Sequence, residues 1–212
     1  NLNYVVHHLL IAEKFGFIPT VDMANYYTLY NEKRDIKGTD NSWEYYFEPV
    51  SKYSLTEIYK SKNVIISDGK TRGNNFFDSF KNLNKDHKKV FNKYIKIKKN
   101  LILEKNKFYK KNFKNLKILG VHFRGTDYKN RERHPFPVSK KQITTIIDNL
   151  NNKHKYHKIF LVTEEKEYLN FLKNRYKNLV HFSGIFTNKK QIFFEKFTKN
   201  IRYKIGKENI ID

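Results

Sequence analysis

The sequence LKILGVHF at residues 116–123 opens the part of the chain that decides the fold. It is a nearly continuous apolar run, and two more follow at residues 158–163 and 179–182, so each is typical of a strand buried in a parallel sheet. The residues between these runs have the spacing of amphipathic helices, at 139–150 and at about 164–176. Strands that alternate with helices predict an α/β domain whose parallel sheet is covered on both faces. The first of the two helices is expected to bury four apolar side chains, Ile143, Ile146, Ile147 and Leu150.

Polar residues follow the first strand at its carboxyl end, where parallel α/β sheets bind their ligands. Alternation along the strand places His122 and Arg124 on the same side of the chain. A planar guanidinium there can donate two N–H bonds to a diphosphate. Gly125 allows a ligand to approach the backbone, and Thr126 can hydrogen-bond a phosphate or cap the loop. Asp127 can hold the arginine or fix the turn, and the residues alone leave open a plain surface turn in which Arg124 pairs with Asp127.

The first half of the chain has a weaker pattern. Apolar residues at helical spacing predict a helix at 2–15 that a glycine ends. Two short strands are expected at 17–22 and 64–67. Between them, Ser54 with Glu57 three residues later predicts the capped start of a helix.

Two longer segments each allow two interpretations. The aromatic segment 43–49, WEYYFEP, either forms a stacking platform for an acceptor sugar or, more simply, packs a long loop as a hydrophobic cluster. A long helix is expected within 78–113, where apolar residues form one stripe against many lysines. This helix either bridges two domains or lies on the surface of one.

The composition limits the classes of protein to consider. The net charge is +22, with 43 Lys and Arg residues against 21 Asp and Glu residues, as in proteins that bind nucleic acid. The lysines are spread over the whole chain among Asn, Ile, Tyr and Phe, which favours the bias of an AT-rich genome over a dedicated polyanion surface. The chain has no cysteine, which excludes disulfides and thiolate metal sites. No apolar run approaches the ~20 residues of a membrane-spanning helix, so we expect a cytoplasmic protein or one peripheral to the inner face of the membrane.

Residues 119–127, LGVHFRGTD, resemble the His-x-Arg-x-Thr-Asp motif of the superfamily of α-1,6-fucosyltransferases, nodulation fucosyltransferases and protein O-fucosyltransferases. The resemblance implies a GT-B fold, with two Rossmann-like domains containing parallel sheets, and a GDP-fucose donor bound mainly by the C-terminal domain. It implies that Arg124 contacts the donor diphosphate and that His122 contacts the nucleotide. The α-1,6 enzymes have a second, adjacent arginine where this chain has Gly125, so their detailed phosphate clamp and linkage specificity do not carry over.

A second match lies in the next strand, at residues 159–165. It resembles a family strand that ends near Thr163, and the acidic residue that follows in the family reads the guanine edge. The resemblance makes Glu165, or else Glu164, the guanine-binding residue. The alternative is that both glutamates only favour the positive N-terminus of the following helix.

Two looser matches lie nearer the ends of the chain. Residues 206–212 resemble the family's Gly-x-x-x-Ile-Leu-Asp stretch, which precedes the last nucleotide-binding helix. Residues 1–6 stand where related enzymes have a Gly-rich loop that runs into Asn-Gln-Leu, although the glycines are absent. Asn1 or Asn3 is therefore expected to face the donor or the acceptor.

Inverting sugar transfer needs a base for the acceptor hydroxyl and a group that stabilises the leaving diphosphate. Arg124 is expected to take the second role. Glu132 stands about where the α-1,6 enzymes have a proposed catalytic glutamate, and its alternative is a solvated charge between Arg131 and Arg133. His134, before a proline-rich turn, is a further loop candidate. The chain has no Asp-x-Asp sequence, so we expect no metal and no cofactor besides the nucleotide-sugar donor.

These expectations amount to a fragment of a bacterial-type glycosyltransferase of the α/β class. Residues 1–114 form the acceptor-side domain with its linking helix, and residues 115–212 form the nucleotide-sugar-binding domain, which is incomplete. The expected partners of the protein are a nucleotide sugar and a glycan acceptor, with no specific nucleic acid. Two alternatives remain, a non-catalytic basic protein that binds nucleic acid or polyanions through the lysines of 78–114, and a transferase-fold protein that binds glycans without turnover.

Overall fold

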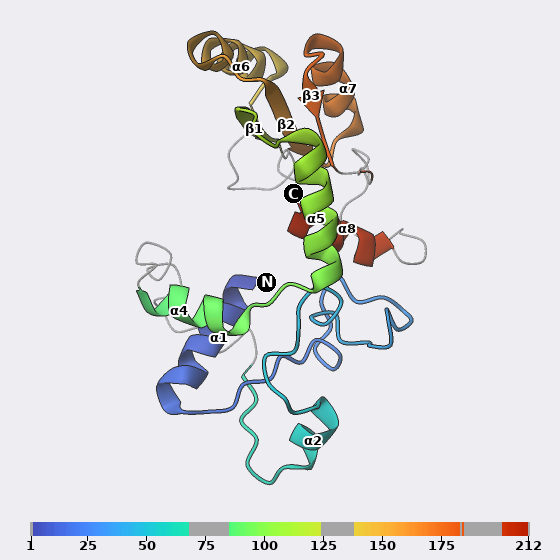
Figure 1. Cartoon of the computed structure of the whole chain (residues 1–212). Helices are drawn as coiled ribbons and strands as arrows, with labels where there is room; N and C mark the ends of the chain where they lie inside the picture. The colour runs from blue at the N-terminus through green and yellow to red at the C-terminus, as the bar shows by residue number, and fades with distance from the viewer. Residues whose placement is uncertain (1, 68–84, 124–137, 183, 185–200, 212) are drawn as a thin grey trace. The chain divides into compact units, whose positions relative to one another are not determined.

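The structure, a computed structural model, describes residues 2–67, 85–123, 138–182, 184 and 201–211. The chain forms two compact units, Asn1–Lys98 and Lys99–Asp212 (Figure 1). The assignment of an acceptor-side and a donor-side domain, with a boundary at residue 114, stays a prediction.

The second unit contains the alternation of strands and helices that the sequence predicts. Three parallel strands form one sheet in the order β1-β2-β3, and a helix connects each strand to the next (Figure 1). The bounds of the elements are α5 Lys99–Asn112, β1 Ile118–Phe123, α6 Lys140–His154, β2 Lys158–Thr163, α7 Lys166–Arg175, β3 Leu179–Val180 and α8 Ile201–Ile211. The α/β class with a parallel sheet is confirmed.

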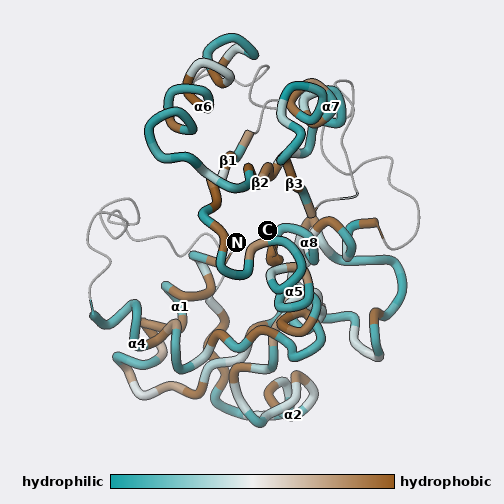
Figure 2. Tube along the Cα trace, turned by 45° about the horizontal axis from the view of Figure 1, so that its top comes forward, coloured by the Kyte–Doolittle hydropathy of each residue, from teal (hydrophilic) through white to brown (hydrophobic). Residues whose placement is uncertain are grey.

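One face of this sheet carries the core of the second unit. Every second residue of β1 and β2 is buried, and the register pairs Leu119 with Ile159 and Phe123 with Thr163. The buried side chains of both strands therefore lie on the same face. Figure 2 shows the strands in largely hydrophobic colours beside the more hydrophilic α6 and α7. The side chains that these two helices add to the core are Ile147, Tyr168, Leu169 and Leu172.

The opposite face of the sheet is covered at β2 by aromatic rings of the segment around α5. The ring centroids of Phe108 and Phe113 lie 5.8 and 5.0 Å from that of Phe160. On the same face of β1, Gly120 and His122 are exposed. β2 is thus covered on both faces, as expected. Among the described residues, β1 is covered only on the face that packs against α6 and α7.

The buried stripe of α6 differs from its expected composition at one residue. Ile147 is 1% exposed, and Ile143 and Leu150 pack against the same core. Ile146 is 47% exposed, so its expected burial is wrong. With about 100° between successive helical residues, Ile146 lies at the margin of the stripe that the other three define.

The first unit contains the helices that the sequence predicts near its start and middle. α1 (Leu2–Phe15) ends in a Schellman motif, in which Gly16 has φ +70° and the N–H of Phe17 donates to the carbonyl of Ala12 at 2.8 Å. α2 (Leu55–Lys60) begins with the expected capping box, since the N–H of Ser54 donates to Glu57 Oε2 at 2.7 Å and the N–H of Glu57 donates to Ser54 Oγ at 3.3 Å.

The two strands expected in the first unit are wrong. Residues 17–22 and 64–67 form no strand, and the side chains of Ile18 and Ile65 are 62% and 71% exposed. A strand needs a neighbour for its backbone groups. Near Val21 the side chain of Asn41 takes that place, because its amide donates to the Val21 carbonyl at 2.8 Å.

The long lysine-rich helix expected within 78–113 is interrupted. Its described part consists of α4 (Lys85–Tyr94) and α5, separated by residues 95–98. The backbone of this break pairs with the aromatic segment 43–49, because Glu48 N–H donates to the Lys96 carbonyl at 2.8 Å and Lys98 N–H donates to the Tyr46 carbonyl at 2.9 Å. These bonds replace helical bonds, and the two helices belong to different units.

Two adjacent isoleucines of α6 test the packing of the second unit. We expect Ile147→Ala to lower the free energy of unfolding by about 2–5 kcal/mol, because it opens a cavity in the core. Ile146→Ala removes the same atoms from an exposed position and should change the free energy by no more than about 0.5–1 kcal/mol. Urea unfolding followed by circular dichroism measures both, and equal losses would contradict the packing described above.

Candidate functional site

The candidate site lies where β1 and β2 end. Because the strands are parallel and Phe123 pairs with Thr163, both carboxyl ends reach the same edge of the sheet. The edge carries polar residues from both strands, His122 from β1 and Glu164 and Glu165 after β2. Ligands of parallel α/β folds bind at such edges. The register thus brings together two segments that are about forty residues apart in the sequence.

Glu165 is a buried acidic residue of this edge. It is 6% exposed and is the N-cap residue of α7, but its side chain makes no capping hydrogen bond. Its backbone is fixed on both sides, since its N–H donates to Thr163 Oγ1 at 3.1 Å and its carbonyl accepts from the N–H of Leu169 at 3.0 Å. The carboxylate is therefore held near the N-terminus of a helix, where negative charge is favoured.

The other described candidates occupy the two faces of the edge. Thr163 is buried on the face of α6 and α7, with its hydroxyl oxygen accepting from the backbone of Glu165. His122 is exposed on the opposite face, and Glu164 is half-buried. Asn3 lies exposed on α1 in the first unit. The structure therefore gathers four of the strand-end candidates, His122, Thr163, Glu164 and Glu165, at one edge and leaves Asn3 in a separate unit.

The remaining candidates are Asn1 and residues of the segment that follows β1 in the chain. Asn1, Arg124, Gly125, Thr126, Asp127, Glu132 and His134 lie outside the described residues. The roles expected for them stay predictions. Their described neighbour is Phe123, the last residue of β1, which is 5% exposed.

Tyr168 is a residue of this edge that the sequence analysis did not select. It lies in the first turn of α7, is 3% exposed, and stacks flat on Phe123 with ring centroids 3.4 Å apart and an interplanar angle of 2°. Burial raises the pKa of its hydroxyl, and the charge of Glu165 raises it further. In the sequence Tyr168 counts as one more apolar residue of an amphipathic helix, so only the stack on Phe123 and the burial of its hydroxyl, both visible in the structure, set it apart.

The segment expected to precede a helix near the C-terminus is itself helical. Residues 206–211 lie inside α8, and the resemblance of residues 206–212 to the stretch that precedes the last nucleotide-binding helix of the family stays a prediction. Lys207 of α8 pairs with Glu104 of α5 at 2.9 Å. Glu208 accepts from the backbone N–H of Gly184 at 2.9 Å, which ties α8 to the chain beyond β3.

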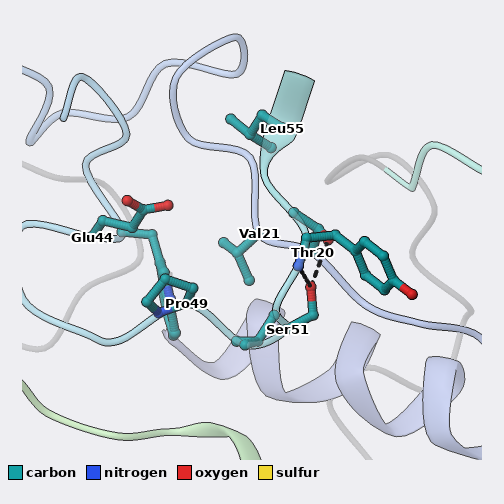
Figure 3. A pocket seen from close by; sticks show the side chains of 9 residues that line it. Thr20, Val21, Glu44, Pro49, Ser51 and Leu55 are labelled. Atoms are coloured by element: carbon teal, nitrogen blue, oxygen red, sulfur yellow. Dashed lines mark hydrogen bonds between the residues drawn. The ribbon is translucent and has the colours of Figure 1, made fainter. Parts of the chain in front are cut away.

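The aromatic segment 43–49 packs a loop and does not form an open platform. Trp43 is 3% exposed and stacks on Phe47 with ring centroids 4.3 Å apart. A small pocket nearby has a cavity volume of about 20 Å³, far less than the roughly 300–1,000 Å³ of typical ligand sites. In Figure 3 the hydroxyl groups of Thr20 and Ser51, which line this pocket, face each other with their oxygens 3.4 Å apart. The packing interpretation of this segment is correct.

The described residues lack two further features. They contain no group of three or more His, Asp or Glu side chains arranged to hold a metal ion. Among their helices none has both the length and the apolar character needed to cross a bilayer.

Solved structures share this fold, although no protein-family model and no curated protein matches the sequence. The chain is similar to the crystal structure of fucosyltransferase NodZ from Bradyrhizobium, with 13% identity, a TM-score of 0.58, and coverage of 99% of this chain and 78% of that one. NodZ alpha-1,6-fucosyltransferase soaked with GDP-fucose gives 13% identity, a TM-score of 0.57 and the same coverage.

A third structure matches less of the molecule. NodZ alpha-1,6-fucosyltransferase co-crystallized with GDP aligns with 60% of this chain and 37% of its own length, at 15% identity and a TM-score of 0.40, too low to carry an argument. This chain therefore spans 37% to 78% of the length of the structures named here. The likeness to the two longer matches confirms the α/β fold of GT-B type.

Two neighbouring residues of β1 test which of its side chains are buried at the edge. We expect Phe123→Ala to lower the free energy of unfolding by about 3–5 kcal/mol, because the stack on Tyr168 and the burial of the ring are lost. His122→Ala, on the exposed side of the same strand, should stay within about 0.5 kcal/mol of the wild type. Thermal unfolding of both variants supplies the comparison, and a stable Phe123 variant would refute the buried end of β1.

Proposed function

We propose that the protein is a glycosyltransferase that moves a sugar, fucose from GDP-fucose, to a glycan hydroxyl with inversion and without a metal ion. The observation that carries the proposal is the parallel register of β1 and β2. It brings the strand that leads into the HFRGTD sequence to the same edge as Thr163 and the two glutamates. The fold is shared with NodZ, whose structure soaked with GDP-fucose supports a nucleotide-sugar donor at low identity.

The proposed roles follow from the chemistry of a diphosphate leaving group. Negative charge develops on the diphosphate as the bond to the sugar breaks, and a guanidinium can donate two parallel hydrogen bonds to it. Arg124, next in the chain after Phe123, is the residue for this role. Glu165, or else Glu164, accepts hydrogen bonds from the guanine, and Glu132 takes the proton of the acceptor hydroxyl.

Replacement of Arg124 tests the donor site. We expect Arg124→Ala to weaken GDP binding by about 2–5 kcal/mol, because it removes a charge-assisted contact with the diphosphate. It should also abolish transfer from GDP-fucose. Isothermal titration calorimetry with GDP measures the first effect, and a donor-consumption assay measures the second.

A matched arginine variant separates this effect from a general loss of positive charge. Arg175 pairs with Asp148 at 2.6 Å, at the C-terminal end of α7, which points away from the carboxyl ends of the strands. Arg175→Ala should leave GDP affinity within experimental error of the wild type. Equal GDP affinity in the wild type and the Arg124 variant would overturn the proposed role of Arg124.

The rival function is non-catalytic binding of polyanions. Its support is the exposed lysines of α4 and α5, among them Lys88, Lys89, Lys107 and Lys110. A polyanion binder would bind RNA or DNA with an affinity that falls steeply with salt and would not prefer GDP to other nucleotides. Salt-dependent nucleic-acid binding together with absent GDP binding would favour this rival over the transferase.

A further inference from the structure

Tyr168 presents a buried polar atom at the edge where the donor is proposed to bind. Its side chain is 3% exposed, and its hydroxyl has no hydrogen-bond partner among the described residues. A buried hydroxyl that makes no hydrogen bond destabilises the protein, because it gives up its bonds to water without replacement. A phenylalanine at this position would fill nearly the same volume without that cost. The hydroxyl therefore needs a hydrogen-bond partner that the described residues do not supply.

The position of Tyr168 relates this hydroxyl to both strand ends. Its ring lies on Phe123, the last residue of β1, and the residue itself follows Glu165 by three positions on the first turn of α7. Burial raises the pKa of the hydroxyl, and the negative charge of Glu165 adds to this effect. The phenol therefore stays protonated at neutral pH and is available as a hydrogen-bond donor. The edge thus combines a neutral O–H donor with a buried carboxylate acceptor.

A donor beside a carboxylate matches one edge of guanine. Guanine presents an acceptor at O6 and donors at N1 and N2, whereas adenine presents a donor at N6 in place of O6. We propose that the Tyr168 hydroxyl donates to O6 of the donor guanine while the Glu165 carboxylate accepts from N1–H and N2–H. The inference rests on the proposed function, which supplies the GDP moiety and the role of Glu165. It adds Tyr168 as the residue that selects the 6-oxo group.

Tyr168→Phe is the variant that isolates the hydroxyl, because the ring and its stack on Phe123 remain. We expect it to bind GDP about tenfold more weakly than the wild type, as for the loss of one hydrogen bond to a ligand. We expect its melting temperature without ligand to be equal to or higher than that of the wild type. Calorimetric titration and thermal unfolding measure the two properties on the same protein.

Tyr176→Phe is the matched control. The hydroxyl of Tyr176 donates to Asp148 Oδ1 at 2.7 Å, at the opposite end of α7. Removal of this hydroxyl should lower the melting temperature and leave GDP affinity unchanged. We therefore expect Tyr168→Phe to weaken GDP binding without lowering the melting temperature. Tyr176→Phe should lower the melting temperature without weakening GDP binding.

A sulfur analogue of the ligand tests the contact with O6 directly. 6-Thio-GDP keeps N1–H and N2–H but carries a weaker acceptor at position 6. The wild type should prefer GDP to 6-thio-GDP several-fold, and Tyr168→Phe should bind the two alike. A loss of this preference identifies a direct contact, because a merely structural role of Tyr168 would weaken both ligands equally.

The outcomes distinguish this inference from the proposed function. If the wild type does not bind GDP, the proposed function fails and the inference fails with it. If the wild type binds GDP and Tyr168→Phe binds it equally well, the inference alone is overturned. A lower melting temperature for Tyr168→Phe with unchanged GDP affinity would also overturn it, since the hydroxyl would then serve the folded chain and not the ligand.

Discussion

The parallel pairing of β1 with β2 is the interaction on which the rest of the second unit depends. Six residue pairs, from Ile118 with Lys158 to Phe123 with Thr163, fix the register. A slip by one residue would turn every buried side chain of one strand to the opposite face. The same register decides that both strands end at one edge. Core packing and the candidate site are thus set by a single constraint.

The face and the edge of this sheet bury different kinds of side chain. The face that packs on α6 and α7 is apolar, with Ile159 and Leu161 fully buried. At the edge the chain buries polar groups instead, Thr163, Glu165 and the hydroxyl of Tyr168. Thr163 is hydrogen-bonded to the backbone of Glu165, whereas the buried hydroxyl of Tyr168 has no hydrogen-bond partner among the described residues and therefore costs free energy, which makes it the functional signal at this edge.

The sequence predicts best what depends on local periodicity. The strands at β1 and β2 follow from continuous apolar runs, and the start of α2 follows from Ser54 and Glu57. Expectations fail where a distant segment decides the local structure. The break between α4 and α5 depends on hydrogen bonds to residues 46 and 48, and the chain near Val21 depends on the side chain of Asn41. No local pattern contains this information.

The candidate site also contains residues that the sequence predicts and one that it does not. Thr163 and the two glutamates could be named from the sequence, because a strand ends there in a family-like pattern. Tyr168 could not, because its spacing is that of an ordinary buried helical residue and its significance comes from the stack on Phe123. Ile146 illustrates the opposite error, since a residue at the margin of a helical stripe is buried or exposed according to the width of the neighbouring layer.

A crystal structure of the protein grown with GDP would test the central claim most directly. We expect electron density for the nucleotide at the carboxyl ends of β1 and β2, with the guanine beside Glu165 and the diphosphate beside the chain that follows Phe123. Nucleotide density at the amino ends of the strands, or on the first unit alone, would contradict the claim that the register of these two strands builds the donor site.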